Sequence, residues 1–518
     1  MKEKTYEGTK KTQNGLKRMF FSALAILLQA VFMVYMFTRL NEYAAAINTT
    51  TSVLAIILVL GLYNREQTAS MTTPWIILIL AFPIMGVSLY LLVGLNGAPN
   101  KMRARFEEVD SMLLPCLPEN ADILSDMYEK VPQAAGISTY LAKNALYPVY
   151  QNTDVTYYDQ ASKGLEAQLS DLSKARKFIF MEYYIVAERT VWDEIFAVLK
   201  ERAAAGVEIH LIIDDFGTLT RLSDGTLQAI KDAGIEVEIF NPVHRYINRL
   251  YFNYRDHRKI TVIDGYVAYA GGINIGDEYA NRIERFGYWK DSTVRLTGDG
   301  AWGFAVQFMQ MWKMLGRHFP NEDDYYRSRR EGPAVEGFCQ PFEDGPLNNP
   351  DNPVEAVYLQ LIASAKRMLY ITTPYYAVEE SIQEALCIAA DAGVDVRLMI
   401  PAIPDKKLVY LVAETYWGEL LRHGVKIYKY TPGFVHAKSA MADREAALIG
   451  STNMDYRSFQ LHYEDAVMLY HMPVIEELLE DMDHIVEDSQ LYTLEDWENR
   501  PWLRRMTASI LKLGAIWL

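Results

Sequence analysis

The first hundred residues are far more apolar than the rest of the chain. Two uncharged stretches, Met19–Phe37 and Pro74–Leu95, approach or reach the roughly 20 residues that a membrane-spanning helix needs. A third stretch, Val53–Tyr63, is shorter and spans only if the polar residues before it also enter the membrane. We therefore expect residues 1–100 to form a membrane anchor with two or three transmembrane helices. A cleaved signal peptide is the alternative for the first stretch, and buried soluble helices for the other two.

Basic residues flank this apolar region on both sides. Lysines and an arginine precede the first stretch, and Lys101, Arg103 and Arg105 follow the last one. Positive charge favours the cytosolic side of a membrane, and two spans place both clusters there whereas three do not. We expect the remainder of the chain to lie in the cytosol.

After residue 100 the pattern changes to short apolar strands that alternate with helical segments, which is typical of an α/β fold. Three pairs of segments also resemble each other. These pairs are 173–186 with 363–378, 202–215 with 389–402, and 232–242 with 422–432. The repeat predicts two similar α/β halves packed about a pseudo-two-fold axis. The predicted division is a linker at 101–135, a first half at 136–330, a second half at 331–500 and an amphipathic C-terminal helix at 501–518.

One motif, His-x-Lys-x-x-x-x-Asp, occurs once in each predicted half. The first copy contains His257, Lys259 and Asp264. The second copy contains His436, Lys438 and Asp443. Each copy reads as a strand, on which alternate residues face the same side, so His and Lys project together.

The aspartates belong to the turns that follow. Asp264 precedes Gly265, and Asp-Gly between apolar strands predicts a hairpin. We expect Asp264 and Asp443 to have a structural role in these turns. Asn274 and Asn453 follow the two histidines at the same spacing, each two residues after a Gly-Gly or Gly-Ser pair, and we expect them to re-enter the site.

Two histidines, two lysines and two asparagines suit the transfer of a phosphoryl group. An imidazole can attack phosphorus or move a proton near neutral pH, and cationic or amide groups can neutralise the phosphate oxygens. Lysines then do what metal ions do elsewhere, so we expect no metal and no cofactor. A zinc site is the rival interpretation, but neither motif has a further His or Cys near it in the sequence.

Charge and composition narrow the function further. The net charge of −15 argues against a general nucleic-acid binder, and 50 % hydrophobic residues allow a large core. Three cysteines form no Cys-x-x-Cys pair and are expected to be buried free thiols. Segment 244–259 interleaves arginines with aromatic residues, and 501–518 reads as an amphipathic helix; both suit an anionic membrane interface.

The paired motifs resemble those of the phospholipase D superfamily. Segments such as "NYRDHRKITVIDG", "AGGINIGDEY" and "GSTNMDYRSFQLHYED" are similar to bacterial cardiolipin synthases, and the resemblance runs from about residue 65 to the C-terminus. It implies two pseudo-symmetric α-β-α halves that share one active site, preceded by transmembrane helices. It also implies a multi-pass protein of the bacterial cell membrane that acts on phosphatidylglycerol and other anionic lipids. The resemblance is compatible with an oligomer and does not decide the oligomeric state.

The resemblance also implies roles for particular residues. Two phosphatidylglycerols give cardiolipin and glycerol; His257 attacks phosphorus, and His436 protonates glycerol and then activates the second hydroxyl. The phosphate oxygens are held by Lys259, Lys438, Asn274 and Asn453, helped by Ser451. Glu464 is expected behind His257, and Asp291 behind His436.

Three other functions stay open at this point. The same site can use water, as in a phospholipase D or a nuclease, or can transfer to serine, as in a phosphatidylserine synthase. A non-catalytic membrane scaffold is a further alternative, although both motifs are intact.

Overall fold

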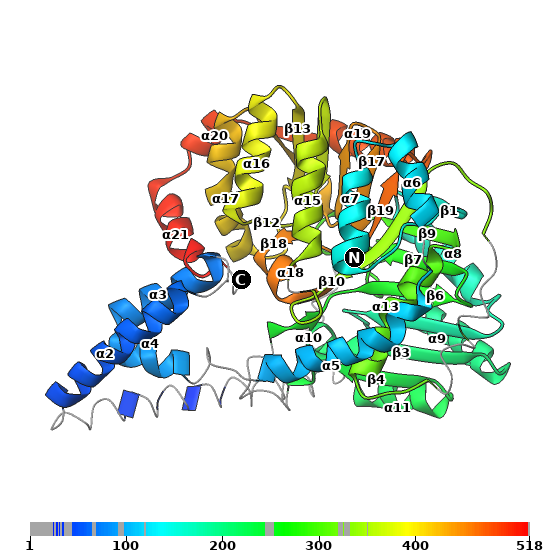
Figure 1. Cartoon of the computed structure of the whole chain (residues 1–518), viewed down its shortest axis with the longest axis horizontal. Helices are drawn as coiled ribbons and strands as arrows, with labels where there is room; N and C mark the ends of the chain where they lie inside the picture. Colours follow the sequence, from blue (N-terminus) through cyan, green and yellow to red (C-terminus); the bar gives the residue numbers. More distant parts are fainter. Residues whose placement is uncertain are drawn as a thin grey trace.

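The computed structural model describes residues 44–64, 69–91, 98–118, 121–243, 253–319, 332–349 and 351–515, with isolated positions between 24 and 35 and Tyr325. Two α/β halves lie side by side, and a group of N-terminal helices extends from one flank (Figure 1).

The first half is built on a seven-stranded sheet in the order β1-β9-β7-β6-β2-β3-β4. Its strands are β1 (Thr153–Tyr158), β2 (Phe178–Tyr183), β3 (Glu208–Asp214), β4 (Glu236–Phe240), β6 (Lys259–Ile263), β7 (Val267–Gly271) and β9 (Thr293–Gly298). The helices of this half are α8 (Ala161–Leu172), α9 (Thr190–Ala204), α10 (Asp215–Thr218), α11 (Asp224–Asp232) and α13 (Ala301–Met314). The parallel pairs β2–β3 and β3–β4 are connected through helices, as the repeat of strand and helix predicted.

The second half repeats this order as β10-β19-β17-β16-β11-β13-β14, with β20 added at the edge. Its strands are β10 (Phe338–Asp344), β11 (Met368–Thr372), β13 (Asp395–Pro401), β14 (Lys426–Tyr430), β16 (Ser439–Ala442), β17 (Ala446–Gly450), β19 (His462–Tyr470) and β20 (Ser489–Tyr492). Its helices are α15 (Pro353–Ser364), α16 (Glu380–Asp391), α17 (Lys407–Arg422), α18 (Tyr456–Gln460), α19 (Val474–Glu487), α20 (Leu494–Glu498) and α21 (Trp502–Lys512). The matching strand orders confirm the prediction of an α/β protein with two similar halves.

Short strands cross between the halves at the two motifs. β5 (Arg255–Asp256), just before His257, pairs with β19 of the second half. β15 (Gly433–Val435), just before His436, pairs with β8 (Tyr288–Lys290) of the first half. A further small pair joins β12 (Tyr376–Ala377) to β18 (Met454–Asp455) within the second half. The exchange is reciprocal, so each histidine stands where its own half meets the other.

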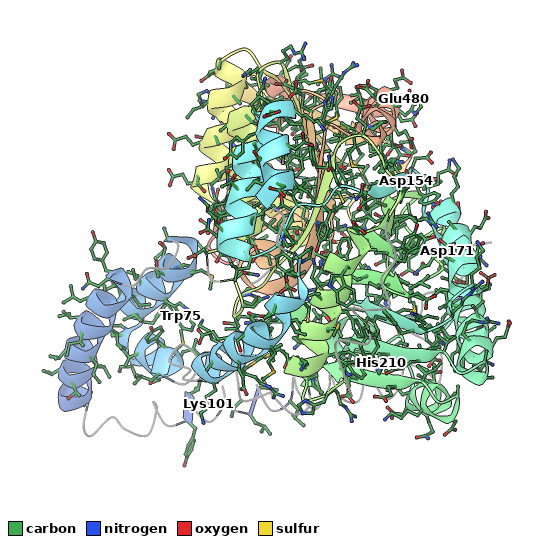
Figure 2. The ribbon with its side chains drawn as sticks, turned by 45° about the vertical axis from the view of Figure 1, so that its right-hand side comes forward. Trp75, Lys101, Asp154, Asp171, His210 and Glu480 are labelled. Carbon is green, nitrogen blue, oxygen red and sulfur yellow. The ribbon has the colours of Figure 1, made fainter. Side chains whose placement is uncertain are left out.

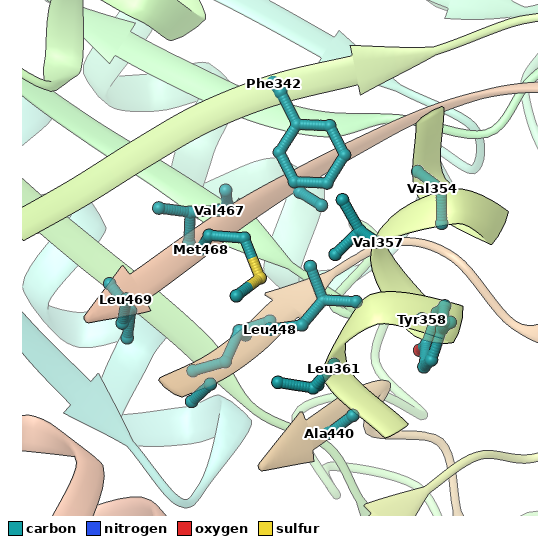
Figure 3. Packing of buried hydrophobic residues seen from close by; sticks show 14 of the residues in the cluster. Phe342, Val354, Val357, Tyr358, Leu361, Ala440, Leu448, Val467, Met468 and Leu469 are labelled. Carbon is teal, nitrogen blue, oxygen red and sulfur yellow. The ribbon is translucent and has the colours of Figure 1, made fainter. Parts of the chain in front are cut away.

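The core runs through both halves. All residues of α13 are buried, including the polar Gln307, Gln310 and Lys313. In the second half, α15 packs Val357 and Leu361 against the sheet residues Leu448 and Met468 (Figure 3). The segment 101–135 also joins the core: α5 (Ala98–Leu113), the short turn η5 (Leu114–Cys116) and α6 (Ala121–Lys130) precede α7 (Ala135–Tyr140) and η6 (Leu141–Ala145). Phe106 and Met127 from this segment are buried.

The N-terminal helices form a separate small cluster. They are α2 (Ala44–Tyr63), α3 (Ala69–Ala81) and α4 (Pro83–Leu89). Trp75 lies in this cluster (Figure 2), and its ring packs against Tyr90 at 5.3 Å between centroids. The stretch Pro74–Leu95 is therefore interrupted, because Pro83 has no backbone N–H with which to continue α3.

Two or three transmembrane helices were predicted in residues 1–100. Within the described part of the chain, no helix combines the length and the apolar character needed to cross a bilayer. Most of Met19–Phe37 lies outside the described residues.

Candidate active site

The backbone places His257 and His436 in equivalent positions. The N–H of His257 donates to the carbonyl of Tyr463 at 2.9 Å, and the N–H of His436 donates to the carbonyl of Lys290 at 2.7 Å. Each histidine is thus anchored by a strand of the other half, next to the short strands that cross over. Both side chains are almost completely buried.

A carboxylate from the opposite half contacts each imidazole. His257 Nδ1 lies 2.9 Å from Glu464 Oε2, and His436 Nδ1 lies 2.6 Å from Asp291 Oδ2. A carboxylate at Nδ1 holds the proton there and leaves Nε2 free to attack or to exchange a proton. The structure therefore pairs each histidine with the carboxylate that the resemblance implied.

Burial controls the protonation of the two histidines. Burial, followed by the charge of Lys259, lowers the pKa of His257 well below its usual value. Burial and Lys438 likewise lower the pKa of His436 to about 4, although Asp291 acts in the opposite direction. Both imidazoles are therefore neutral at neutral pH in the free protein, which is the form that a nucleophile requires.

The two lysines are buried beside the histidines. The ammonium groups of Lys259 and Lys438 donate to the backbone carbonyls of His257 and His436, respectively. Burial lowers the pKa of Lys259 to about 8 and that of Lys438 to about 7, partly offset by the site carboxylates. An anionic phosphate placed between them favours their charged forms, so both can neutralise its oxygens.

The motif aspartates lie at the far ends of the hairpins. Asp264 has φ = +54° at the turn between β6 and β7, and its carboxylate accepts from the N–H groups of Arg176, Lys177 and Phe178. Asp443 has φ = +53° at the corresponding turn in the second half. Its contacts have the same pattern: it accepts from the N–H groups of Lys366, Arg367 and Met368. These contacts join each hairpin to the neighbouring strand and involve neither histidine.

The asparagines and Ser451 differ in what they contact. Asn274 Oδ1 accepts from the N–H of Ile185 at 3.0 Å, and the Asn274 side chain also hydrogen-bonds to the hydroxyl of Tyr279. Asn453 Oδ1 is buried and has no hydrogen-bond partner within the described protein. The hydroxyl of Ser451 donates to Glu464, so this side chain contacts the carboxylate behind His257.

Sequence reasoning missed His462, which lies close to His257. Nitrogen and oxygen atoms of His257, His462 and Glu464 lie within 4.8 Å of one another, and all three residues are buried. Two imidazoles and a carboxylate are donors that Zn²⁺ accepts. The charges of Lys259 and Arg457 act on this cluster and oppose a divalent cation there.

Segment 244–259 was expected to present its arginines to a membrane interface, and the structure corrects this for Arg255 and Arg258, which are both buried in the protein. Arg258 is fully buried and forms an ion pair with Glu343 of the second half at 2.6 Å, and Glu182 lies 3.5 Å from it. Its alternation with His257 and Lys259 on a strand was the available signal, since it predicts that Arg258 points to the opposite face. Much of the basic and aromatic segment 244–259 lies outside the described residues, as does the chain beyond 515.

Comparisons with known proteins agree with this arrangement. Residues 169–285 and 358–486 match a family described as the phospholipase D-like domain of cardiolipin synthase, and residues 52–94 match the N-terminal region of the phospholipase D-nuclease group. The cardiolipin synthase of Geobacillus kaustophilus is 32 % identical over 89 % of this chain and 91 % of its own length. Cardiolipin synthase 2 of Bacillus anthracis is 32 % identical over 90 % of both chains.

A solved structure shares the fold. The phosphatidylserine synthase of Haemophilus influenzae superposes with a TM-score of 0.57 at 13 % identity, over 74 % of this chain and all of that one. At this identity the likeness concerns the fold alone.

Proposed function

The chain belongs to the cardiolipin synthase family of the phospholipase D superfamily, and we propose that it condenses two phosphatidylglycerol molecules into cardiolipin and glycerol. The observation that carries this proposal is the pair of buried histidines, each held at Nδ1 by a carboxylate of the opposite half. One phosphodiester between them can be attacked from one side while its alcohol leaves on the other.

In the first step, Nε2 of His257 attacks the phosphorus of phosphatidylglycerol and the bond from phosphorus to the glycerol oxygen breaks. His436 supplies the proton that leaves with glycerol. The negative phosphodiester raises the pKa of His436 when it binds, because it stabilises the charged imidazolium. The product of this step is a phosphatidyl group on His257.

In the second step, the hydroxyl of another phosphatidylglycerol attacks the same phosphorus. His436, now neutral, takes the hydroxyl proton as the new bond forms, and the bond to His257 breaks. Lys259, Lys438, Asn274 and Asn453 hold the phosphate oxygens in both steps, and Glu464 and Asp291 stabilise the imidazolium that forms beside each of them.

The proposal includes a location at the bacterial cell membrane, with multi-pass helices in residues 1–100 and the two halves on the cytosolic side. It is supported by exposed apolar side chains on α2 and α3, among them Ile56, Leu60 and Leu80. Helix α21 exposes a second apolar surface, which consists of Trp502, Leu503, Met506, Ile510 and Leu513.

The test uses the full chain purified in detergent and mixed with phosphatidylglycerol micelles, with a chelator present. Lipid products are identified by mass spectrometry for the wild type, His257→Ala and His436→Ala. We expect cardiolipin and glycerol from the wild type only. Phosphatidic acid in place of cardiolipin would identify a hydrolase, and phosphatidylserine formed when serine is added would identify the serine transferase.

A second measurement addresses the intermediate. A phosphatidyl group on His257 can be returned to glycerol, so the wild type should incorporate isotopically labelled glycerol into phosphatidylglycerol. His257→Ala should not. Cardiolipin synthesis without this exchange would contradict the covalent step.

A further inference from the structure

The two half-sites share a feature that involves neither motif. His462 pairs with Arg255, the residue two positions before His257, through the parallel strands β19 and β5. Trp289 pairs with Phe434, two positions before His436, through the parallel strands β8 and β15. Each of these rings also lies two residues before a site carboxylate, Glu464 or Asp291. His462 and Trp289 are therefore pseudo-symmetric equivalents.

Each ring packs against the imidazole of its half-site at nearly the same distance. The centroids of His462 and His257 are 5.2 Å apart, and those of Trp289 and His436 are 5.1 Å apart. Each ring also presents a nitrogen to the carboxylate. Trp289 Nε1 donates to Asp291 Oδ2 at 3.4 Å, and His462 Nδ1 lies 3.5 Å from Glu464 Oε1.

The tautomer of His462 follows from its other nitrogen. Arg457 Nε donates to His462 Nε2 at 3.4 Å, so Nε2 acts as the acceptor and the proton of the neutral ring lies on Nδ1. His462 Nδ1 is buried and has no hydrogen-bond partner within the described residues. A buried N–H without a partner is stabilised when it reaches an acceptor. The carboxylate oxygen nearest to this N–H is Glu464 Oε1.

Each carboxylate is contacted by its catalytic imidazole, by the ring two residues before it and by further donors of its own half. Asp291 is contacted by His436, by the indole of Trp289 and by the backbone N–H of Ser292 at 3.0 Å. Glu464 is contacted by His257, by the hydroxyls of Ser451 and Ser458 and, at longer range, by the imidazole of His462. An indole is always a donor, whereas an imidazole donates at Nδ1 only while its tautomer is maintained.

We propose that His462 is a positioning residue for the chemistry at His257, whose Nδ1–H holds the Glu464 carboxylate in place as Trp289 holds Asp291. The inference rests on the proposed function insofar as His257 forms the bond to phosphorus. When Nε2 of His257 attacks, its ring becomes positive and is stabilised by an ionised Glu464, although burial raises the pKa of this carboxyl well above its usual value. In that state the contact between the Nδ1–H of His462 and Glu464 Oε1 becomes shorter. This contact lowers the basicity of the Glu464 carboxylate.

The test compares two substitutions at one position. His462→Phe retains a ring and removes both nitrogens, while His462→Asn retains an N–H donor in a smaller side chain. Rates are measured on the full chain in detergent with phosphatidylglycerol and with bis(4-nitrophenyl) phosphate, a chromogenic phosphodiester that needs only the attack at phosphorus. Thermal unfolding shows whether each variant is folded.

We expect His462→Phe to lower kcat by roughly 10- to 100-fold with little change in KM, as for other partners that orient a reacting group. Loss of the Nδ1–H donor of His462 raises the pKa of Glu464. The fall in kcat on the acidic side of the pH profile, here called the acid limb, should therefore occur at higher pH in this variant. His462→Asn should keep the wild-type limb and recover most of kcat.

Two outcomes would overturn the proposal. In one, His462→Phe retains wild-type kcat and the wild-type acid limb. In the other, both variants lose activity equally with no change in the limb, which would show that only packing of the ring matters. The expected pattern on bis(4-nitrophenyl) phosphate without any cardiolipin from the wild type would instead refute the proposed function and leave the role of His462 standing.

Discussion

Asp443 accepts hydrogen bonds from three consecutive backbone N–H groups, at 2.7, 2.8 and 2.9 Å, where the chain enters β11. Asp291 contacts His436. The two buried aspartates therefore have different partners. Replacing each of them by asparagine should affect mainly stability at Asp443 and mainly catalysis at Asp291.

Asp443→Asn should lower the free energy of unfolding by about 1–3 kcal/mol, because the amide N–H₂ meets backbone donors. Its kcat per folded molecule should stay within about twofold of wild type. Asp291→Asn should reduce kcat by at least about 100-fold, because the wrong tautomer of His436 is then favoured. Denaturant unfolding and the micelle assay measure both effects; an equal loss of kcat in the two variants would contradict the structural role of Asp443.

Protonation of His436 should also appear in the stability of the protein. Its pKa is about 4 in the folded state, below the roughly 6.5 of an unfolded chain. Between these values the unfolded state binds a proton that the folded state does not. The free energy of unfolding should therefore fall as pH decreases from about 6.5 to about 4, by up to about 1.4 kcal/mol per pH unit.

The measurement is denaturant unfolding at several pH values for the wild type and His436→Gln. The variant lacks the titrating group, so its stability should depend less steeply on pH in this window. Equal slopes for the two proteins would contradict a neutral, buried His436.

At the scale of secondary structure, the two hairpins were the most predictable elements. Asp-Gly predicted the turn between β6 and β7, and the structure confirms it with positive φ at Asp264 and Gly265. In the second half Arg444 occupies the glycine position at φ = +64°. The Asp-Gly pair is absent there, so the second hairpin was predictable from its similarity to the first half and not from its own turn residues. Hydrophobic length alone did not predict the interruption between α3 and α4, where Pro83 lacks the backbone N–H that would continue the helix.

Helix α21 docks on the protein along one side and exposes apolar side chains along another. One side docks on α17, where Arg504 forms an ion pair with Glu414 at 2.7 Å and Ala508 is buried. The apolar surface of Trp502, Leu503, Met506, Ile510 and Leu513 faces away from the domain, at the spacing of one helical stripe. A helix of this kind is suited to lie in a membrane interface.

Ile510→Asp should therefore weaken binding to anionic vesicles without changing the fold. A buried charge on the apolar side opposes insertion into the lipid, so we expect at least a tenfold lower partition coefficient. Ile388→Asp is the matched control, because Ile388 on α16 is 59 % exposed and Ile510 is 60 % exposed. Vesicle flotation measures both variants in a chain without residues 1–100, whose proposed membrane helices would otherwise dominate binding, and equal binding by the two would contradict a membrane role for α21.

At the scale of the whole molecule, the halves interlock and should unfold together. Arg258 reaches from the first motif to Glu343 in the second half, and burial raises the pKa of Glu343 to about 7 against the charge of this arginine. Arg258→Met leaves buried carboxylates without their cation. We expect the free energy of unfolding to fall by about 3–5 kcal/mol, in one cooperative transition for both halves.

The control is Arg282→Met, which breaks the exposed ion pair of Arg282 with Glu194 at 2.6 Å. Such exposed pairs contribute about 0–1 kcal/mol, so the unfolding midpoint should hardly move. Two separate transitions in the Arg258 variant, or equal effects of the two substitutions, would contradict the coupling of the halves through this site.

The sequence by itself determined what depends on local order: the α/β repeat, the two motifs, the shared face of each His–Lys pair and the hairpin that follows. These features are set by alternation along a strand and by turn chemistry, which act over a few residues. The carboxylates Glu464 and Asp291 came from resemblance to a family. Only the tertiary structure decided the exchange of β5 and β15, the contacts of Arg258 and Ser451, and the place of His462 beside His257. Those contacts join residues far apart in the chain, and they exist because two sheets of matching order pack with both motifs at their junction.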